Sequence, residues 1–347
     1  MKGVSDVELY DVTIVGGGPA GLYSAFYSGM RDMKTKVIEY HPYLGGKVNI
    51  FLEKVLWDVG GQPPIVAAKF VESLIEQAKT FEPTICLDEK VERIEKEQNY
   101  FVIYTNKGEQ HYSKSVIIAI GGGIAEPIKL ELEGAEKFEM TNLHYTINGL
   151  ERFRDKEVLI SGGGNAAIDW AVELLPVAKQ VTVIYRNDEL KAHEAQVKKL
   201  RAAGATILLN TELVKLVAND EKTAIERVIV QEGSAQRTLA VQELLVCHGY
   251  NREVSLDFMD EIAPERNEHQ QFYSEGQCQT TVPGIFAVGD IVAYNDKVYL
   301  LVGTFQDAVL AVNSAKQFIE PTADRYAMVS SHNEKFQQRN AQLLANV

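Results

Sequence analysis

The stretch Tyr10–Met30, YDVTIVGGGPAGLYSAFYSGM, decides how the chain folds. A β-branched run up to Val15 leads into a glycine-rich turn, and apolar residues at helical spacing follow that turn. A second short run, Thr35–Ile38, closes on the acidic residue Glu39. This order predicts a strand, a glycine turn, a helix and a second strand, which is the setting in which a G-x-G-x-x-G pattern binds a dinucleotide.

Each glycine of this motif has a physical task. Gly16 permits the tight turn, Gly18 lets the backbone approach a pyrophosphate, and Gly21 keeps the helix close to the strand. The pyrophosphate is then expected at the positive end of the helix, on its unpaired N–H groups. Glu39 can accept hydrogen bonds from both hydroxyls of an unphosphorylated ribose, so the motif favours the adenosine half of FAD or of NAD.

The same pattern recurs in Glu157–Tyr185, where EVLIS precedes GGGNAA and a second helix. This copy ends beside Arg186 instead of an acid, and a cation attracts the 2′-phosphate that an acid would repel. The second motif therefore favours NADPH, while a solvated basic turn and glycines that serve only the turn are the alternatives. The candidate NADPH residues are Gly162, Gly164, Asn165, Ala166, Arg186, Asn187, Lys191 and His193.

A third landmark lies near the C-terminal end, where Thr280–Asp290 reads TTVPGIFAVGD and a helical pattern follows from about Gly303 to Ile319. Asp290 at a strand end can bond the ribitol hydroxyls of a flavin. The N-terminus of the following helix would then face the N1–C2 edge of the isoalloxazine and stabilise negative charge there. A buried aspartate in an ordinary loop is the alternative.

Composition narrows the class of protein. The 347 residues are 46% apolar, which fits two globular domains, and the net charge of −13 argues against general nucleic-acid binding. We expect no membrane span and no secretory signal, because no long apolar run occurs and the N-terminus is acidic, and hence a cytoplasmic location. Cys86, Cys247 and Cys278 form no C-x-x-C pair, so we expect buried small residues and neither a redox dithiol nor a metal knuckle.

These motifs resemble those of a known family. Over nearly its whole length the chain resembles the ferredoxin–NADP reductases of thioredoxin-reductase type, in GGGPAGLYSAFYSGMR, LGGK, WDVGG, GGGNAAIDWA, AHE, IFAVGD and AVNSAK. The resemblance implies an α/β fold with two nested Rossmann-like domains of three ββα layers, and a homodimer. Residues 1–120 and 251–347 would form the discontinuous FAD domain, and residues 121–250 the NAD(P)H domain. A dithiol is absent from the helix start at Asn165, so disulfide reduction by that route is excluded.

The resemblance also assigns flavin contacts. It places Lys47 after the LGG turn, Phe51 against the isoalloxazine with Leu52 as the alternative, Val91 at the adenine and Ala125 beside the flavin. Ser331 would supply a hydroxyl from the tail of the other subunit, and the ring that covers the flavin there would come from Tyr326, Val329 or His332. The FAD candidates are therefore Gly16, Gly18, Pro19, Ala20, Gly21, Glu39, Lys47, Phe51, Val91, Ala125, Asp290 and Ser331.

The implied activity is an FAD-dependent reductase that passes electrons from NADPH to ferredoxin or flavodoxin, by reversible hydride transfer to flavin N5, with no catalytic side chain. The phosphate clamp has one arginine fewer than the family pattern, so NADH is an alternative donor. Two other functions stay open: a reductase of iron chelates, quinones or oxygen, and a flavin-based redox sensor. An acidic acceptor also requires a locally basic docking face on this acidic chain.

Overall fold

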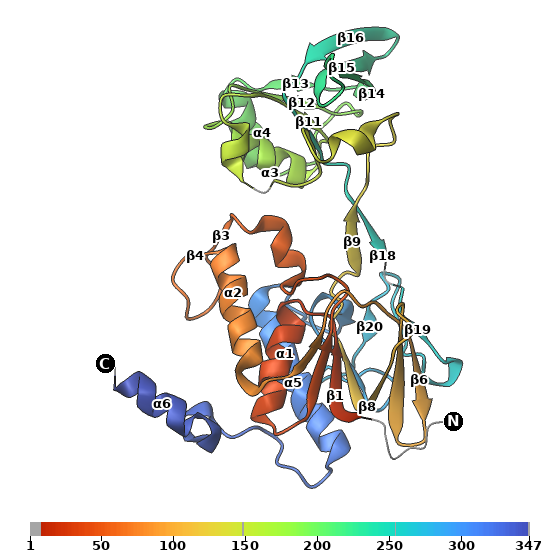
Figure 1. The fold of residues 1–347 in the computed structure, drawn as a ribbon, viewed down its shortest axis with the longest axis vertical. Coiled ribbons are helices and arrows are strands. Elements are labelled where there is room, and N and C mark those ends of the chain that lie inside the picture. Colours follow the sequence, from red (N-terminus) through yellow and green to blue (C-terminus); the bar gives the residue numbers. More distant parts are fainter. Residues whose placement is uncertain (1–7, 148, 254, 346–347) are drawn as a thin grey trace. The chain divides into compact units, whose positions relative to one another are not determined.

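The computed structural model describes residues 8–147, 149–253 and 255–345. It divides the chain into two compact units: unit 1 runs to Ile124 and resumes at Arg252, and unit 2 is Ala125–Asn251. The connecting strands β9 (Ile124–Pro127) and β18 (Tyr250–Glu253) pair with each other (Figure 1). Unit 2 is thus inserted in the sequence of unit 1.

Unit 1 is built on a parallel sheet of order β21-β8-β1-β2-β5. From β8 the sheet continues through β7 and β6, which pair antiparallel, to the edge strand β19. The strand β19 pairs with β6 in parallel. The strands are β1 (Leu9–Val15), β2 (Thr35–Ile38), β5 (Thr84–Cys86), β6 (Val91–Glu97), β7 (Tyr100–Thr105), β8 (Gln110–Ile118), β19 (Asp257–Phe258) and β21 (Ile285–Ala287).

Three helices cover one face of this sheet, namely α1 (Pro19–Met30), α2 (Ala67–Ala78) and α5 (Leu301–Ile319) (Figure 1). The strand residues alternate between the two faces. Ile14 and Ile117 pack in the cluster that holds the helices, whereas Val116 and Ile118 pack against β6 and β7 on the other side. This period of two produces a layer of helices, a parallel sheet and a layer of antiparallel strands.

The remaining elements of unit 1 are short, apart from the C-terminal helix. They are the 3-10 helices η2 (Gly46–Phe51), η3 (Lys79–Phe81), η6 (Asp260–Ile262), η7 (Gly289–Ile291), η8 (Ser330–His332) and η9 (Glu334–Phe336), the strands β3 (Val55–Leu56), β4 (Ile65–Val66), β20 (Phe272–Tyr273) and β22 (Val292–Ala293), and α6 (Gln337–Leu344). The tail contacts its own unit, because the rings of Phe336 and Phe81 lie 5.4 Å apart and Lys335 pairs with Asp32.

Unit 2 repeats the three layers. Its parallel sheet has the order β10-β17-β11-β12-β13, with the helices packed against one face and the antiparallel β14-β15-β16 against the other. The elements are η4 (Ala135–Phe138), β10 (Leu143–His144), η5 (Leu150–Phe153), β11 (Glu157–Ser161), α3 (Asn165–Leu174), β12 (Gln180–Ile184), α4 (Glu194–Ala202), β13 (Thr206–Leu208), β14 (Thr211–Ala218), β15 (Ile225–Glu232), β16 (Ala235–Ala240) and β17 (Glu243–Val246).

Buried charge fixes one edge of the unit 2 sheet. Glu243, 3% exposed at the start of β17, accepts a hydrogen bond of 2.6 Å from His144 of β10 and pairs with Lys156 beside β11. Burial alone would raise the pKa of Glu243, but the bonds from His144 and Lys156 outweigh it and hold that pKa below its ordinary value.

Among the helices of the described ranges, none is long and apolar enough to cross a membrane.

Candidate functional site

The first glycine turn lies between the carboxyl end of β1 and the start of α1. Gly16 has φ +111° and donates its N–H to Ile38 O at 2.8 Å. A Cβ on Gly16 would lie 2.5 Å from Ala119 O, and a Cβ on Gly21 would lie 1.9 Å from Gly16 O. Both positions therefore require glycine, and α1 starts in close contact with the strand that precedes it.

The N-terminus of α1 is open to an anion. Gly18 is the N-cap without a side-chain hydrogen bond, and Pro19 takes the first helical position. The LGG turn approaches from the side, since a Cβ on Gly46 would lie 2.7 Å from the Cα of Gly18. Backbone atoms of two glycines thus lie beside the helix terminus, in the arrangement that allows a pyrophosphate to reach the N–H groups.

Glu39 lies at the end of β2 and is 6% exposed. Its Oε2 accepts the N–H of Gly17 at 2.5 Å, and its Oε1 accepts the N–H of His41 at 2.8 Å. An ionised carboxylate has about four acceptor positions, so each oxygen keeps capacity for a further donor. The two backbone bonds fix the carboxylate beside the glycine turn, where both ribose hydroxyls could reach it.

Lys47 and Asp290 meet on the same side of unit 1. The Lys47 Nζ lies 3.8 Å from Asp290 Oδ2, and both side chains are partly exposed. Asp290 belongs to η7, whose first residue Gly289 has φ +76° and would bring a Cβ within 3.1 Å of the Cβ of Ala20 in α1. This contact places the Asp290 turn against the first turn of α1, so the chain's late strand and its first motif share one site.

The other flavin candidates are distributed as follows. Phe51 ends η2 half-buried against the Val48 cluster, and Val91 begins β6 with 6% exposure. The backbone of Ala125 lies in β9, while its side chain is outside the described residues. Ser331 is exposed in η8, as are the tail alternatives Tyr326, Val329 and His332. The contacts of unit 1 thus join the glycine turn, Glu39, Lys47 and Asp290, and the tail residues stay a prediction.

The second glycine turn repeats the geometry in unit 2. Gly162 has φ +149°, and a Cβ there would lie 2.4 Å from Cys247 O. A Cβ on Gly163 would lie 2.4 Å from the ring of Tyr185, whereas one on Gly164 would meet no atom within 4 Å among the described residues. The first two glycines are enclosed by protein, and the third leaves open space at the start of α3, where Asn165 and Ala166 are exposed.

The loop of residues 186–193, which carries Arg186, Lys191 and His193, is hydrogen-bonded to this glycine turn. Lys191 donates its N–H to Gly163 O at 2.7 Å, and His193 donates its N–H to Asn165 Oδ1 at 2.9 Å. These two bonds hold the loop against the N-terminus of α3. The backbone of Lys191 and His193 therefore lies beside the glycine turn, and binding of NADPH by these residues stays a prediction.

Arg186 follows β12 with an exposed side chain, and its charge acts on His248, which the sequence did not assign to the nucleotide site. Burial first, and then the charge of Arg186, lower the pKa of His248, whose Nε2 lies 2.8 Å from Ser161 Oγ. Asn187 uses its amide to donate to Tyr185 OH at 2.9 Å. His248 follows β17, and since β17 pairs with β11 in parallel, its carboxyl end lies at the nucleotide edge of the sheet.

Residues 10–315 match the pyridine nucleotide-disulphide oxidoreductase family. The chain belongs to this family. The family name and the two nucleotide turns agree, so the protein is an oxidoreductase that uses a pyridine nucleotide, and the α/β prediction of two Rossmann-like domains is confirmed.

Within this oxidoreductase family the chain is similar to curated relatives along its full length. It is 55% identical to ferredoxin--NADP reductase 3 of Lysinibacillus sphaericus and 51% identical to ferredoxin--NADP reductase 1 of Bacillus licheniformis, with 97% of each chain covered. Two solved thioredoxin reductases share the fold: that of Lactococcus lactis (25% identity, 89% and 99% covered, TM-score 0.69) and that of T. acidophilum (20%, 89% and 98%, 0.70). The protein is thus a reductase of the ferredoxin--NADP type.

The cysteines of this oxidoreductase are free thiols. Cys278 is buried, and Cys86 and Cys247 are half-buried. Burial raises the pKa of Cys247 to about 12 and is the main cause of the raised pKa of Cys278 and Cys86. The three thiols therefore stay protonated near neutral pH and are poor nucleophiles.

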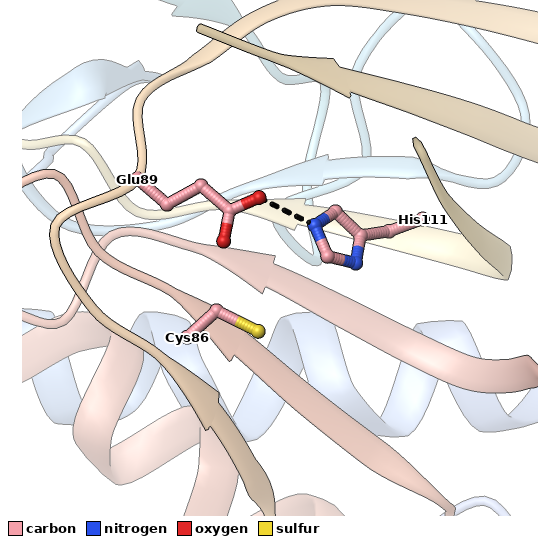
Figure 2. A group of neighbouring side chains, drawn as sticks. All are labelled: Cys86, Glu89 and His111. Carbon is pink, nitrogen blue, oxygen red and sulfur yellow. Dashed lines mark hydrogen bonds and ion pairs between the residues drawn. The ribbon is translucent and has the colours of Figure 1, made fainter. Parts of the chain in front are cut away.

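Cys86, Glu89 and His111 bring zinc-type donor atoms within 4.8 Å of one another (Figure 2). Both ring nitrogens of His111 already have partners: Nε2 lies 2.8 Å from Glu89 Oε1, and Nδ1 lies 2.9 Å from Lys36 Nζ. An ammonium group only donates, so Nδ1 accepts from Lys36 and the ring proton lies on Nε2, toward Glu89. This tautomer occupies the nitrogen that a metal would need, and the group links β5, β8 and the segment that leads into β6.

Proposed function

We propose that the protein transfers electrons from NADPH, through bound FAD, to ferredoxin or flavodoxin. One observation carries the proposal: the two glycine turns end on opposite charges, Glu39 in unit 1 and Arg186 in unit 2. A carboxylate suits an unphosphorylated ribose, and a guanidinium suits a 2′-phosphate. The full-length similarity to ferredoxin--NADP reductases supports the same assignment of cofactors.

The residues of unit 1 fit FAD. The pyrophosphate would lie on the N–H groups of α1 beside Gly18 and Gly46, and the adenosine ribose on Glu39. Asp290 would bond the ribitol, with Lys47 adding positive charge nearby. Val91 is proposed for the adenine and Phe51 for the flavin end, and Ala125, the first residue of unit 2, is proposed for the flavin end as well.

The residues of unit 2 fit NADPH. The open space over Gly164 admits a pyrophosphate at the N-terminus of α3, and the loop bonds of Lys191 and His193 hold two further polar side chains near it. Arg186 would pair with the 2′-phosphate through charge-assisted hydrogen bonds. NADH, which lacks this phosphate, would gain nothing from Arg186.

When bound, FAD supplies hydride acceptance from NADPH and electron donation to the acceptor. The task of the chain is to bind, orient and desolvate, so no side chain is assigned as an acid or base. The three cysteines are far apart in the sequence and protonated, which leaves direct transfer from the flavin to the acceptor.

A comparison of acceptors tests this function. Purified holoprotein would be mixed anaerobically with NADPH or NADH and with a low-potential ferredoxin, a flavodoxin, or ferric citrate, and a separate aerobic sample would measure oxygen reduction. We expect fast ferredoxin or flavodoxin reduction with NADPH and slower rates with NADH. Rapid ferric citrate or oxygen reduction beside negligible ferredoxin reduction would favour a small-acceptor reductase, and slow turnover with every acceptor would favour a redox sensor.

A homodimer and a cytoplasmic location stay predictions. In a dimer the tail with Ser331 would reach the partner's flavin, whereas in one chain Lys335 donates to Gly29 O at 3.1 Å. Light scattering during size-exclusion chromatography would decide the oligomeric state. A monomer at micromolar concentration that binds FAD fully would contradict the role of the tail.

A further inference from the structure

A buried carboxylate in the middle of α5 is shared by three other segments of unit 1. Asp307 is fully buried. Its Oδ2 accepts the N–H of Gly289 at 2.9 Å and pairs with the Lys297 ammonium, and its Oδ1 accepts the Tyr294 hydroxyl at 2.6 Å. One side chain thus joins η7, the residues after β22 and the segment that leads into α5.

Both members of the ion pair are removed from water. The Lys297 side chain is 2% exposed and that of Asp307 is 0% exposed. Taking two charges out of water costs so much that apolar residues of similar size are often equally stabilising or more so. Stability alone therefore does not explain the pair, and its geometry provides a better reason.

The pair fixes the parts that would surround a flavin. Asp307 holds Gly289, the residue before Asp290, and a Cβ on Gly289 would lie 3.1 Å from Ala20 of α1. Next to Lys297, Val298 O lies so close to α5 that a Cβ on Gly303 would be 2.1 Å from it. The Lys297–Asp307 pair therefore sets the position of Asp290 and of the N-terminus of α5 relative to the start of α1.

Tyr294 is a further hydrogen-bond donor to Asp307. Burial first, and then its hydrogen bond to Asp307, raise the pKa of the Tyr294 hydroxyl, so it stays protonated and keeps donating. Burial and Asp307 also raise the pKa of Cys278, which lies against the same carboxylate. Gly289, Tyr294, Lys297 and Cys278 thus each direct a proton or a positive charge toward Asp307.

We propose that Lys297 and Asp307 are positioning residues for the flavin, which hold the ribitol-binding Asp290 and the positive end of α5 in register. The proposal rests on the proposed FAD site. Without the pair, the turn and the helix terminus would be free to shift. FAD would then bind more weakly, and its reduced, anionic form would lose stabilisation from the helix dipole.

The test replaces the pair by apolar residues in the double variant Lys297→Met/Asp307→Leu. We expect the apoprotein to fold with a lower Tm, because the Gly289 N–H and the Tyr294 hydroxyl lose their acceptor. We also expect its FAD Kd to rise about tenfold by fluorescence titration, and its flavin midpoint potential to become more negative. Lys316→Met is the matched control, because it breaks the 2.7 Å pair with Glu320 on the same helix, away from η7. This control should leave the Kd and the potential unchanged.

A wild-type Kd and potential in a folded double variant would overturn the positioning role. If that variant does not fold, Tyr294→Phe decides: it removes one anchor and keeps the ion pair, and we expect about a threefold higher Kd, whereas an unchanged Kd would overturn the proposal. A wild-type protein that binds no FAD would instead refute the proposed function.

Discussion

The carboxylate of Glu39 accepts the N–H of Gly17 at 2.5 Å, which joins the end of β2 to the middle of the first glycine turn. The two parts of the predicted adenosine site therefore form one hydrogen-bonded unit. Because Glu39 also accepts from His41, its orientation is fixed before any ligand arrives.

Glu39→Ala should remove the flavin. The variant loses the charged acceptor that we propose for both ribose hydroxyls, and hydrogen bonds to charged groups contribute about 1.5–3 kcal/mol each. We expect the Kd for FAD to rise at least about tenfold. Glu39→Gln should have an intermediate effect, because its amide NH₂ must face one of two backbone donors. Flavin content and fluorescence titration measure both variants, and an unchanged Kd in Glu39→Ala would place the adenosine elsewhere.

Gly21→Ala should destabilise unit 1. The added methyl group would overlap Gly16 O at 1.9 Å, so α1 must move away from β1, at a cost of about 3 kcal/mol. The matched control is Gly60→Ala, where the methyl meets no atom within 4 Å among the described residues, and its stability should change by less than about 1 kcal/mol. Thermal unfolding of the two apoproteins gives the comparison, and equal Tm values would disprove the close contact.

Arg186→Ala should weaken the binding of NADPH and leave the binding of NADH unchanged. Losing charge-assisted bonds to a 2′-phosphate corresponds to roughly a 10- to 100-fold higher KM for NADPH. The exposed Arg201 of α4 provides the control, since Arg201→Ala removes the same charge from unit 2 without touching the glycine turn. Equal losses for both nucleotides would show that Arg186 contacts something other than the 2′-phosphate.

Glu243 should make the free energy of unfolding depend on pH in the acidic range. Its pKa in the folded protein lies below the unfolded value of about 4.3, so its contribution is present above that pH and is lost as the pH falls through the lower folded pKa. Glu243→Gln leaves Lys156 without its partner and should cost about 3 kcal/mol at pH 7. Its Tm should then fall less than that of the wild type between pH 5 and about pH 3. Parallel Tm curves would contradict this role.

Local patterns predicted the nucleotide turns well, because their constraints are local. The expected strands Thr35–Ile38 and Glu157–Ser161 coincide with β2 and β11, and Glu39 follows its strand as a βαβ unit requires. The helix expected from Gly303 starts at Leu301. Gly303 marks the close approach of Val298 and not the helix start, which a pattern along one segment does not reveal.

The parts that were missed depend on contacts across the fold. Asp307 occupies a buried helix position where periodicity expects an apolar residue, and its partner Lys297 lies in a different segment. His248 approaches Arg186 because β17 and β12 both flank β11, an order that the sequence does not state. Such pairs become visible only when the sheet order is known.

The proposed function requires that electrons pass directly from the reduced flavin to ferredoxin. The most direct measurement is a single turnover: holoprotein with its cysteines replaced (Cys86→Ser, Cys247→Ala, Cys278→Ala) is reduced anaerobically with one equivalent of NADPH and mixed with oxidised ferredoxin. We expect the absorbance of the oxidised flavin to return as ferredoxin is reduced, at a rate close to that of the unsubstituted protein. A flavin that stays reduced in the presence of ferredoxin, in the cysteine-free variant alone or in both proteins, would contradict it.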